Sequence, residues 1–183
     1  MNDKEFLNLV TSRQSVRGYT ADPVSQEQVM ACIEAARLAP SACNGQPWKF
    51  IVINDPELRK KVGAETSDRV LPMNHFIFQA PVIVAVVMER ANITSQIGQV
   101  LKGKEFPLID IGIAVEHFCL QACSLGLGTC IIGWFHEERI KKTLNIPRNK
   151  RLALLITLGV PSDKQIRPKK RKTVEDITSF NIY

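Results

Sequence analysis

The stretch LIDIGIAVEHFCLQACSL, residues 108–125, decides the fold that the sequence predicts. Its apolar residues, among them Ile111, Val115 and Phe118, recur at helical spacing and predict one long helix. Gly126 follows directly, at a position where glycine commonly ends a helix. We expect this helix to fill the middle of the fold. If it is apolar all round, a partner subunit must bury part of it.

The segments on either side of this helix alternate between further helices and strands. Ser25 and Gln28 form a plausible capping box for one helix, which Pro40 stops. Residues 81–88 are nearly continuous Val, Ile and Ala, which is typical of a strand buried on both faces. Helices outweigh strands, and this predicts an α+β sandwich with a central sheet covered by helices. The other expected helices are 3–12, 26–39, 56–64 and 137–144, and the expected strands are 48–53, 81–88, 129–132 and 152–160.

The length of 183 residues suits one compact domain covering residues 1–183. Hydrophobic residues make up 45% of the chain and charged residues 23%, which favours a globular fold over disorder. No apolar run reaches the roughly 20 residues that span a bilayer, and the polar start does not resemble a signal peptide. We therefore expect a soluble, cytoplasmic protein without a membrane partner.

The cysteines predict neither a disulfide framework nor a metal site. There are five, Cys32, Cys43, Cys119, Cys123 and Cys130, and none forms a CxxC pair. Cys119 and Cys123 lie one helical turn apart. We expect both to be buried, because free cysteine usually packs as a small apolar residue.

The basic charge is concentrated near the end of the chain. The formal net charge is +6, and six lysines and arginines without an acid lie between Lys164 and Lys172, so the remaining residues balance. Such a patch could bind nucleic acid, a membrane surface or one small phosphorylated ligand. The patch lacks interleaved aromatic residues and a basic helix face, so we expect no nucleic-acid partner.

Two polar segments in the first third of the chain could form a binding site. Residues 13–17, Arg-Gln-Ser-Val-Arg, could grip a phosphate or a polyhydroxyl chain, or could be an exposed basic loop. Residues 40–48, Pro-Ser-Ala-Cys-Asn-Gly-Gln-Pro-Trp, offer neutral groups that can read the edge of a heteroaromatic ring. The alternative is a structured turn in which Ser41 and Asn44 bond their own backbone.

Two further segments lie in the second half of the chain. Residues 125–134, Leu-Gly-Leu-Gly-Thr-Cys-Ile-Ile-Gly-Trp, follow a helix and lack the third glycine of a dinucleotide fingerprint. Gly133 could let a ligand approach the backbone, or the segment could be only a cap, a strand and a turn. Residues 167–172, Arg-Pro-Lys-Lys-Arg-Lys, could match one phosphate or form a solvated tail.

Taken in order, these four segments resemble the nitroreductase family of flavoproteins, and the resemblance runs from about Glu5 to Ile177. It implies a three-layer α/β/α sandwich with a mixed, mainly antiparallel sheet. It also implies an intertwined homodimer built on the long helix, with FMN at the subunit interface. That agrees with the separate inference that one subunit cannot cover this helix.

The resemblance also implies roles for individual residues. The first loop would contact the FMN phosphate, ribityl chain and pyrimidine edge, and two residues near the C-terminus would complete the phosphate site. The loop at 40–44 would come from the other subunit, and a short run after the long helix would lie along the reactive edge. Its two isoleucines leave only the backbone to bond flavin N5. These implied cofactor-binding residues are Arg13, Gln14, Ser15, Arg17, Lys169, Arg171, Pro40, Ser41, Ala42, Asn44, Ile131, Ile132 and Gly133.

The implied chemistry is ping-pong hydride transfer at flavin N5, from NAD(P)H to a nitroaromatic, quinone or similar acceptor. The flavin carries it, so no catalytic side chain is required, although His75, His117 and His136 could donate protons. The positive charge of Arg13 or Arg17 would favour the reduced, anionic form of the flavin. The alternatives are a flavoprotein of the same fold with other chemistry (ring oxidation, dehalogenation or flavin breakdown) and, more distantly, a basic nucleic-acid-binding module through residues 164–172. We expect residues 65–79 and 89–107 to cover the site.

Overall fold

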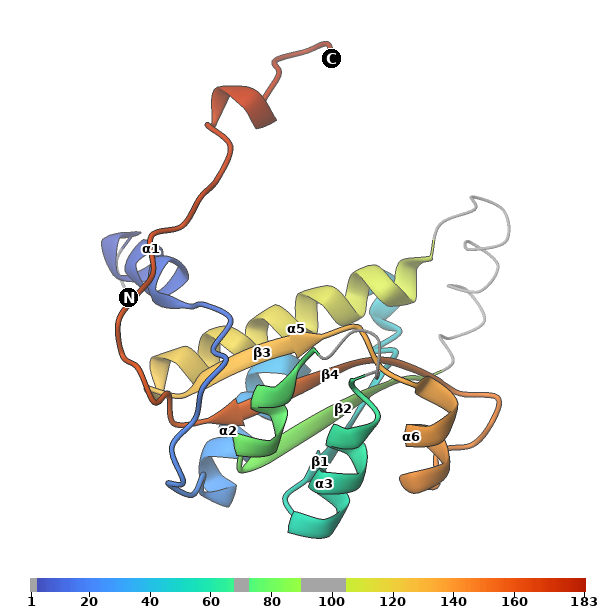
Figure 1. The fold of residues 1–183 in the computed structure, drawn as a ribbon. Coiled ribbons are helices and arrows are strands. Elements are labelled where there is room, and N and C mark those ends of the chain that lie inside the picture. Colours follow the sequence, from blue (N-terminus) through green and yellow to red (C-terminus); the bar gives the residue numbers. More distant parts are fainter. Residues whose placement is uncertain (1–2, 68–72, 90–104) are drawn as a thin grey trace.

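The structure is a computed structural model that describes residues 3–67, 73–89 and 105–183 (Figure 1). The expected cover of the site, residues 65–79 and 89–107, therefore lies partly outside the described residues. Every predicted helix and strand is present, with ends that differ from the prediction by two residues or fewer. The helices are α1 (Asp3–Ser12), α2 (Gln26–Arg37), α3 (Pro56–Ala64), α5 (Phe106–Ser124) and α6 (Glu137–Thr143). The strands are β1 (Trp48–Ile53), β2 (Val82–Met88), β3 (Gly128–Ile132) and β4 (Arg151–Gly159), and the 3-10 turns are η1 (Ala42–Asn44), η2 (His75–Gln79) and η3 (Glu175–Ile177).

The four strands form one sheet in the order β1-β2-β4-β3. Each neighbouring pair runs antiparallel, with Val84 of β2 opposite Val52 of β1 on one side and Ile156 of β4 on the other. A single parallel bridge joins Ser15 to Thr129 of β3. The parallel component among the described residues thus comes from the loop after α1, which adds itself to the β3 edge.

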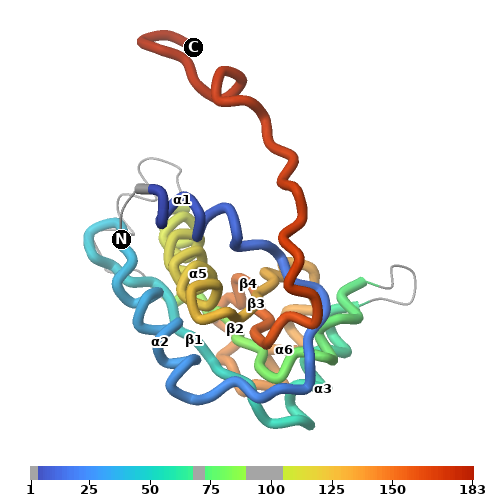
Figure 2. Tube along the Cα trace, turned by 90° about the vertical axis from the view of Figure 1, so that its left-hand side faces the viewer, coloured from blue at the N-terminus to red at the C-terminus, as the bar shows by residue number. Residues whose placement is uncertain are grey.

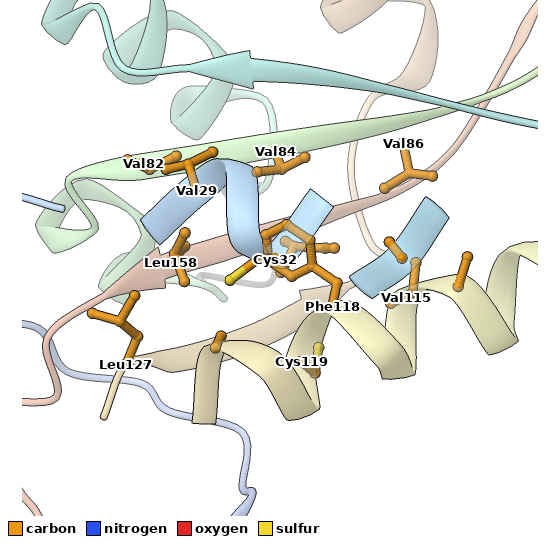
Figure 3. Close-up of a cluster of buried hydrophobic side chains, with 14 of the residues drawn as sticks. Val29, Cys32, Val82, Val84, Val86, Val115, Phe118, Cys119, Leu127 and Leu158 are labelled. Carbon is orange, nitrogen blue, oxygen red and sulfur yellow. The ribbon is translucent and has the colours of Figure 1, made fainter. Parts of the chain in front are cut away.

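Helices cover both faces of the sheet, and this confirms the three-layer α+β architecture (Figures 1 and 2). Alternate residues of β2 face opposite layers, as the geometry of a strand requires. Val82, Val84 and Val86 pack against α2 and α5, where Figure 3 shows Cys32 and Phe118 pointing into the same cluster. Ile83, Ala85 and Val87 of β2 belong to a second core beneath α3 and α6.

Helix α5 is the central helix of the first core. It begins two residues earlier than expected, with Pro107 in its first turn, and it ends before Gly126, whose φ of 74° suits glycine. By length and composition alone this helix could cross a membrane. It packs instead against α2 and the sheet, as the core helix of a layered fold does. Its outer side is open, because Ile109 is 55% exposed and Gly112 is exposed.

The cysteine prediction is half correct. Cys119 is buried, as expected, but Cys123 is only half-buried because it faces α1, where its Sγ lies 3.5 Å from Ser12 Oγ. Burial raises the pKa of the Cys32 thiol to about 12 and that of Cys119 to about 11, so both are protonated near neutrality. These thiols act as core residues.

The chain after β4 leads back to the start of the protein. Figure 2 shows it passing the segment between α1 and α2 and then leaving the body of the molecule. Phe180, Ile182 and Tyr183 near its end are almost fully exposed. Large apolar side chains in this condition generally have a covering surface elsewhere.

Candidate cofactor site

The loop that follows α1 is fixed against β3 by backbone contacts. Val16 N–H donates to Thr129 O at 2.8 Å, next to the parallel bridge of Ser15. Gly128 makes this close approach possible, because a Cβ there would lie 2.6 Å from Val16 Cγ2. Residues 13–17 therefore form a loop that β3 supports.

Two buried hydroxyl groups lie beneath the same loop. Tyr19 Oη is 2.6 Å from Thr157 Oγ1 and donates to Val16 O at 2.9 Å. Burial raises the pKa of Tyr19, so this phenol stays neutral. Sequence reasoning missed the pair, although Thr157 is an isolated polar residue in the apolar strand β4 and could have signalled it.

The C-terminal basic segment crosses the first loop. Arg167 Nε donates to Gln14 Oε1 at 3.0 Å, and its NH2 group donates to Ser15 O at 2.5 Å. Lys169 Nζ donates to Val10 O at 2.7 Å and to Arg13 O at 2.5 Å. These contacts join residues more than 150 positions apart. They hold this segment against the first loop, although Lys169 alone among residues 167–172 is partly buried.

Together the two segments form an open basic hollow of about 390 Å³, lined by Arg13, Gln14, Ser15, Arg17, Arg167, Pro168, Lys169, Lys170 and Arg171. Desolvation lowers the pKa of Lys169, and the charges of Arg13 and Arg171 lower it further. Cations held together in this way repel one another, and a bound anion would relieve that repulsion. The basic hollow is therefore suited to a phosphate group.

The structure brings six of the predicted residues to the basic hollow: Arg13, Gln14, Ser15, Arg17, Lys169 and Arg171. Arg13 also forms an ion pair with Glu116 of α5, at 3.0 Å from its Nε. Arg167 was not predicted as a site residue. It is the first residue of the basic run and the nearest to β4, and that position could have identified it.

The second predicted segment, residues 40–44, lies at the other end of α5. Ala42 N–H donates to Asp110 Oδ1 at 3.1 Å, whereas the start of the first loop is held near Cys123 through Ser12. The two attachment points are thirteen residues apart on one helix, about 20 Å along its axis. Within one chain, the loop that holds Pro40, Ser41, Ala42 and Asn44 thus meets α5 about 20 Å from Cys123 and about 9 Å from Glu116, the partner of Arg13.

This second loop has a constrained backbone. Cys43, Asn44 and Gln46 have φ values of 51°, 52° and 43°, which are unusual for residues other than glycine. Ser41 Oγ accepts from Gln46 N–H at 3.0 Å, and the Gln46 amide donates to Asn44 Oδ1 at 3.0 Å. The expectation of a self-bonded turn is correct for Ser41, whereas the Asn44 side chain bonds another side chain.

The third predicted segment lies at the end of β3, an edge strand of the sheet. The side chain of Ile131 points outward and is 44% exposed, and Gly133 has open space around it. The side chain of Ile132 is only 3% exposed because strand alternation turns it into the second core. The side chain of Ile132 is therefore not available to a ligand.

The histidines do not line the basic hollow. His117 Nδ1 lies 3.2 Å from Ala35 O, and His136 N–H donates to Glu65 O at 2.8 Å. His75 is exposed at the start of η2. None of these three histidines is therefore placed to bind an anion in the basic hollow.

Comparison with known proteins identifies the family. Residues 10–160 match the model of the nitroreductase family. A putative NADH dehydrogenase/NAD(P)H nitroreductase of Archaeoglobus fulgidus is 32% identical, covering 88% of each chain. An FMN reductase [NAD(P)H] of Bacillus subtilis is 30% identical, covering 98% of this chain and 74% of that protein. The crystal structure of a nitroreductase family protein from Clostridium novyi NT has a TM-score of 0.76 at 30% identity, with 89% of this chain and 88% of that chain covered. The chain belongs to the nitroreductase family and is therefore an oxidoreductase.

Proposed function

We propose that this protein is an FMN-dependent NAD(P)H oxidoreductase that reduces a nitroaromatic, quinone or similar acceptor and works as a homodimer. The observation that carries the proposal is the basic hollow, in which both ends of the chain contribute cations. Family membership supports the flavin, and the names of the relatives, FMN reductase and NAD(P)H nitroreductase, support the donor and the acceptor class.

The residues of the basic hollow fit the FMN phosphate. A phosphate monoester carries about −1.5 to −2 charges near neutrality, and Arg13, Arg17, Arg167, Lys169 and Arg171 offer more than enough cations. Ser15 adds a hydroxyl donor. When bound, FMN would supply two-electron chemistry between NAD(P)H and the acceptor.

Other residues would hold the remaining parts of the cofactor. Gln14 would contact its polar edge, and the backbone at Ile131, Ile132 and Gly133 would lie along its reactive side. Pro40, Ser41, Ala42 and Asn44 would come from the partner subunit. The chain's own contribution is to bind, to orient and to leave one face open to donor and acceptor.

Three observations support a homodimer. The outer side of α5 exposes Ile109 and Gly112, and α1 exposes Phe6 and Leu7. The C-terminal tail carries exposed apolar side chains away from its own body (Figures 1 and 2). The second loop, held at Asp110, is not among the residues that line its own chain's basic hollow, so a partner's hollow is the natural place for it.

The contacts of the basic segment favour a small anionic ligand over nucleic acid. Arg167 and Lys169 donate hydrogen bonds to the first loop and to the end of α1, at distances of 2.5–3.0 Å. A nucleic-acid surface would instead present cations along an open face. In the basic hollow, the cations instead gather around residues 13–17.

A screen of electron acceptors tests the function. Protein saturated with FMN is supplied with NADH or NADPH and offered a nitroaromatic, a quinone, free FMN and an iodinated tyrosine. We expect oxidation of at least one nicotinamide that depends on the nitroaromatic, the quinone or free FMN. Turnover of the iodinated tyrosine alone would favour dehalogenation, and nicotinamide oxidation with none of the four would contradict the proposed acceptor class.

A further inference from the structure

Asp110 is a buried carboxylate on the otherwise apolar inner face of α5. The buried residues of this helix are otherwise apolar, yet Asp110 is only 6% exposed. Burying a carboxylate is costly unless hydrogen bonds compensate for the lost water. Asp110 lies one turn inside the helix, so it does not cap the N-terminus of α5. Its position calls for another explanation.

The partner of Asp110 is the backbone of the second loop. Its Oδ1 accepts from Ala42 N–H at 3.1 Å, and Ala42 is the first residue of η1. A hydrogen bond to an ionised acceptor is among the stronger ones in proteins. This contact attaches the loop to the central helix through a group that is itself held in the core.

The attached loop needs such support. Three of its non-glycine residues, Cys43, Asn44 and Gln46, have positive φ values, and a backbone of this kind persists only when its surroundings hold it there. The bonds among Ser41, Asn44 and Gln46 close the loop on itself. They do not fix its orientation relative to α5, whereas the bond to Asp110 does.

We infer that Asp110 is a positioning residue for cofactor binding in the partner subunit. It holds residues 41–46 in their bound shape before FMN arrives, which removes the cost of ordering them on binding. The inference rests on the proposed function, because it needs the second loop to line the partner's FMN. It assigns one buried carboxylate of each subunit to the site of the other.

Three substitutions at Asp110 test the hydrogen bond. Asp110→Asn keeps an acceptor at the same place, Asp110→Ala removes it, and Asp110→Ser keeps a polar group that is too short to reach Ala42. We expect Ala and Ser to weaken FMN binding about tenfold or more and Asn to retain most of it. The visible circular dichroism of bound FMN should change with Ala and Ser at saturation, and amide exchange at Ala42 should speed up without FMN. The exposed Glu57→Ala on α3 serves as control.

A mixed dimer tests whether the effect acts across the interface. One subunit carries Asp110→Ala and the other carries Arg13→Ala. If the loop serves the partner, one site receives both defects and the other receives none. Half of the sites should then bind FMN with wild-type affinity. If the loop serves its own subunit, both sites are defective.

The outcomes of these experiments distinguish a failure of the proposed function from a failure of the role of Asp110. Wild-type protein that takes up no FMN would overturn the proposed function, and amide exchange at Ala42 would still report whether Asp110 holds the loop. FMN uptake with unchanged affinity and circular dichroism in Asp110→Ala and Asp110→Ser would overturn the role of Asp110. A mixed dimer without any wild-type site would overturn its action on the partner. If the Ala variant fails to fold, the contrast between Ser and Asn decides.

Discussion

Single cations at the basic hollow have structural partners as well as a proposed ligand. Arg13 bonds Glu116, Arg167 bonds the first loop, and Lys169 bonds the carbonyls of Val10 and Arg13. The bonds of Arg167 and Lys169 hold their charges beside the first loop before any anion is bound. Preorganised charge of this kind binds an anion without first having to collect the side chains.

Arg13→Ala should lower FMN affinity. One charge-assisted hydrogen bond contributes about 1.5–3 kcal/mol, so we expect a loss of about ten- to a hundredfold in affinity, measured by quenching of flavin fluorescence. Glu116→Gln is the matched control, since it removes the ion pair, keeps Arg13 and takes a negative charge away from the anion site. Its FMN affinity should equal or exceed that of the wild type. Equal flavin content in Arg13→Ala and wild type would refute the role of Arg13.

FMN binding should take up protons at alkaline pH. The pKa of Lys169 is lowered in the free protein, first by desolvation and then by Arg13 and Arg171. A bound phosphate raises that pKa again, so between the two values binding protonates Lys169, and affinity falls as pH rises through this window. Calorimetry in two buffers of different ionisation enthalpy measures the uptake.

Substitutions at neighbouring lysines identify the source of that proton. Lys169→Met should abolish the uptake, whereas Lys170→Met, an exposed neighbour, should leave it in place. Identical heats of FMN binding in both buffers for the wild-type protein would speak against a phosphate beside Lys169.

At the scale of elements, the sequence predicted the order and type of each α-helix and strand among the described residues, because apolar periodicity records which face of each element is buried. It did not predict the support beneath the first loop. That support depends on Gly128, Tyr19 and Thr157, which lie far apart in the chain and meet only after the sheet has formed. Asp110 escaped notice for the same reason, because its partner is a backbone N–H of a distant loop.

Gly128→Ala should destabilise the contact between the first loop and β3. The new Cβ would lie 2.6–2.9 Å from three atoms of the Val16 side chain, so one of the two segments must shift. Overpacking of this kind costs about 1–3 kcal/mol, and each kcal/mol lowers Tm by roughly 2–4 °C in a chain of this size. The double variant with Val16→Ala should recover part of the loss. Unchanged thermal unfolding of Gly128→Ala would show that the contact is not tight.

At the scale of the whole molecule, two features favour the proposed homodimer. Apolar surfaces lie exposed, and the second loop does not line its own chain's basic hollow. In the proposed homodimer, a partner would cover the outer side of α5, the exposed residues of α1 and the tail, and the second loop would reach the partner's basic hollow. The sequence pointed to a dimer through the apolar character of α5 and through the resemblance to the nitroreductase family. The attachment of the second loop to Asp110, near the start of α5, became visible only in the structure.

Gly112→Arg should break the proposed dimer without unfolding the subunit. Nothing lies within 4 Å of a Cβ at Gly112 in one chain, so the arginine has room unless a partner packs there. We expect a monomer by light scattering, an unchanged far-UV spectrum and a large loss of FMN affinity. Leu58→Arg places the same charge on α3, in the opposite layer, and should leave the dimer intact. A Gly112→Arg protein that stays dimeric and binds FMN normally would exclude α5 from the interface.

The most direct test of the account measures molar mass and flavin content on the same sample. The protein is saturated with FMN, freed of excess ligand and passed through a sizing column with light-scattering and visible-absorbance detection. The account predicts a dimer with one FMN per subunit, and joint loss of FMN and of the dimer in Gly112→Arg. A monomer that carries FMN, or a protein that takes up no added FMN, would contradict it.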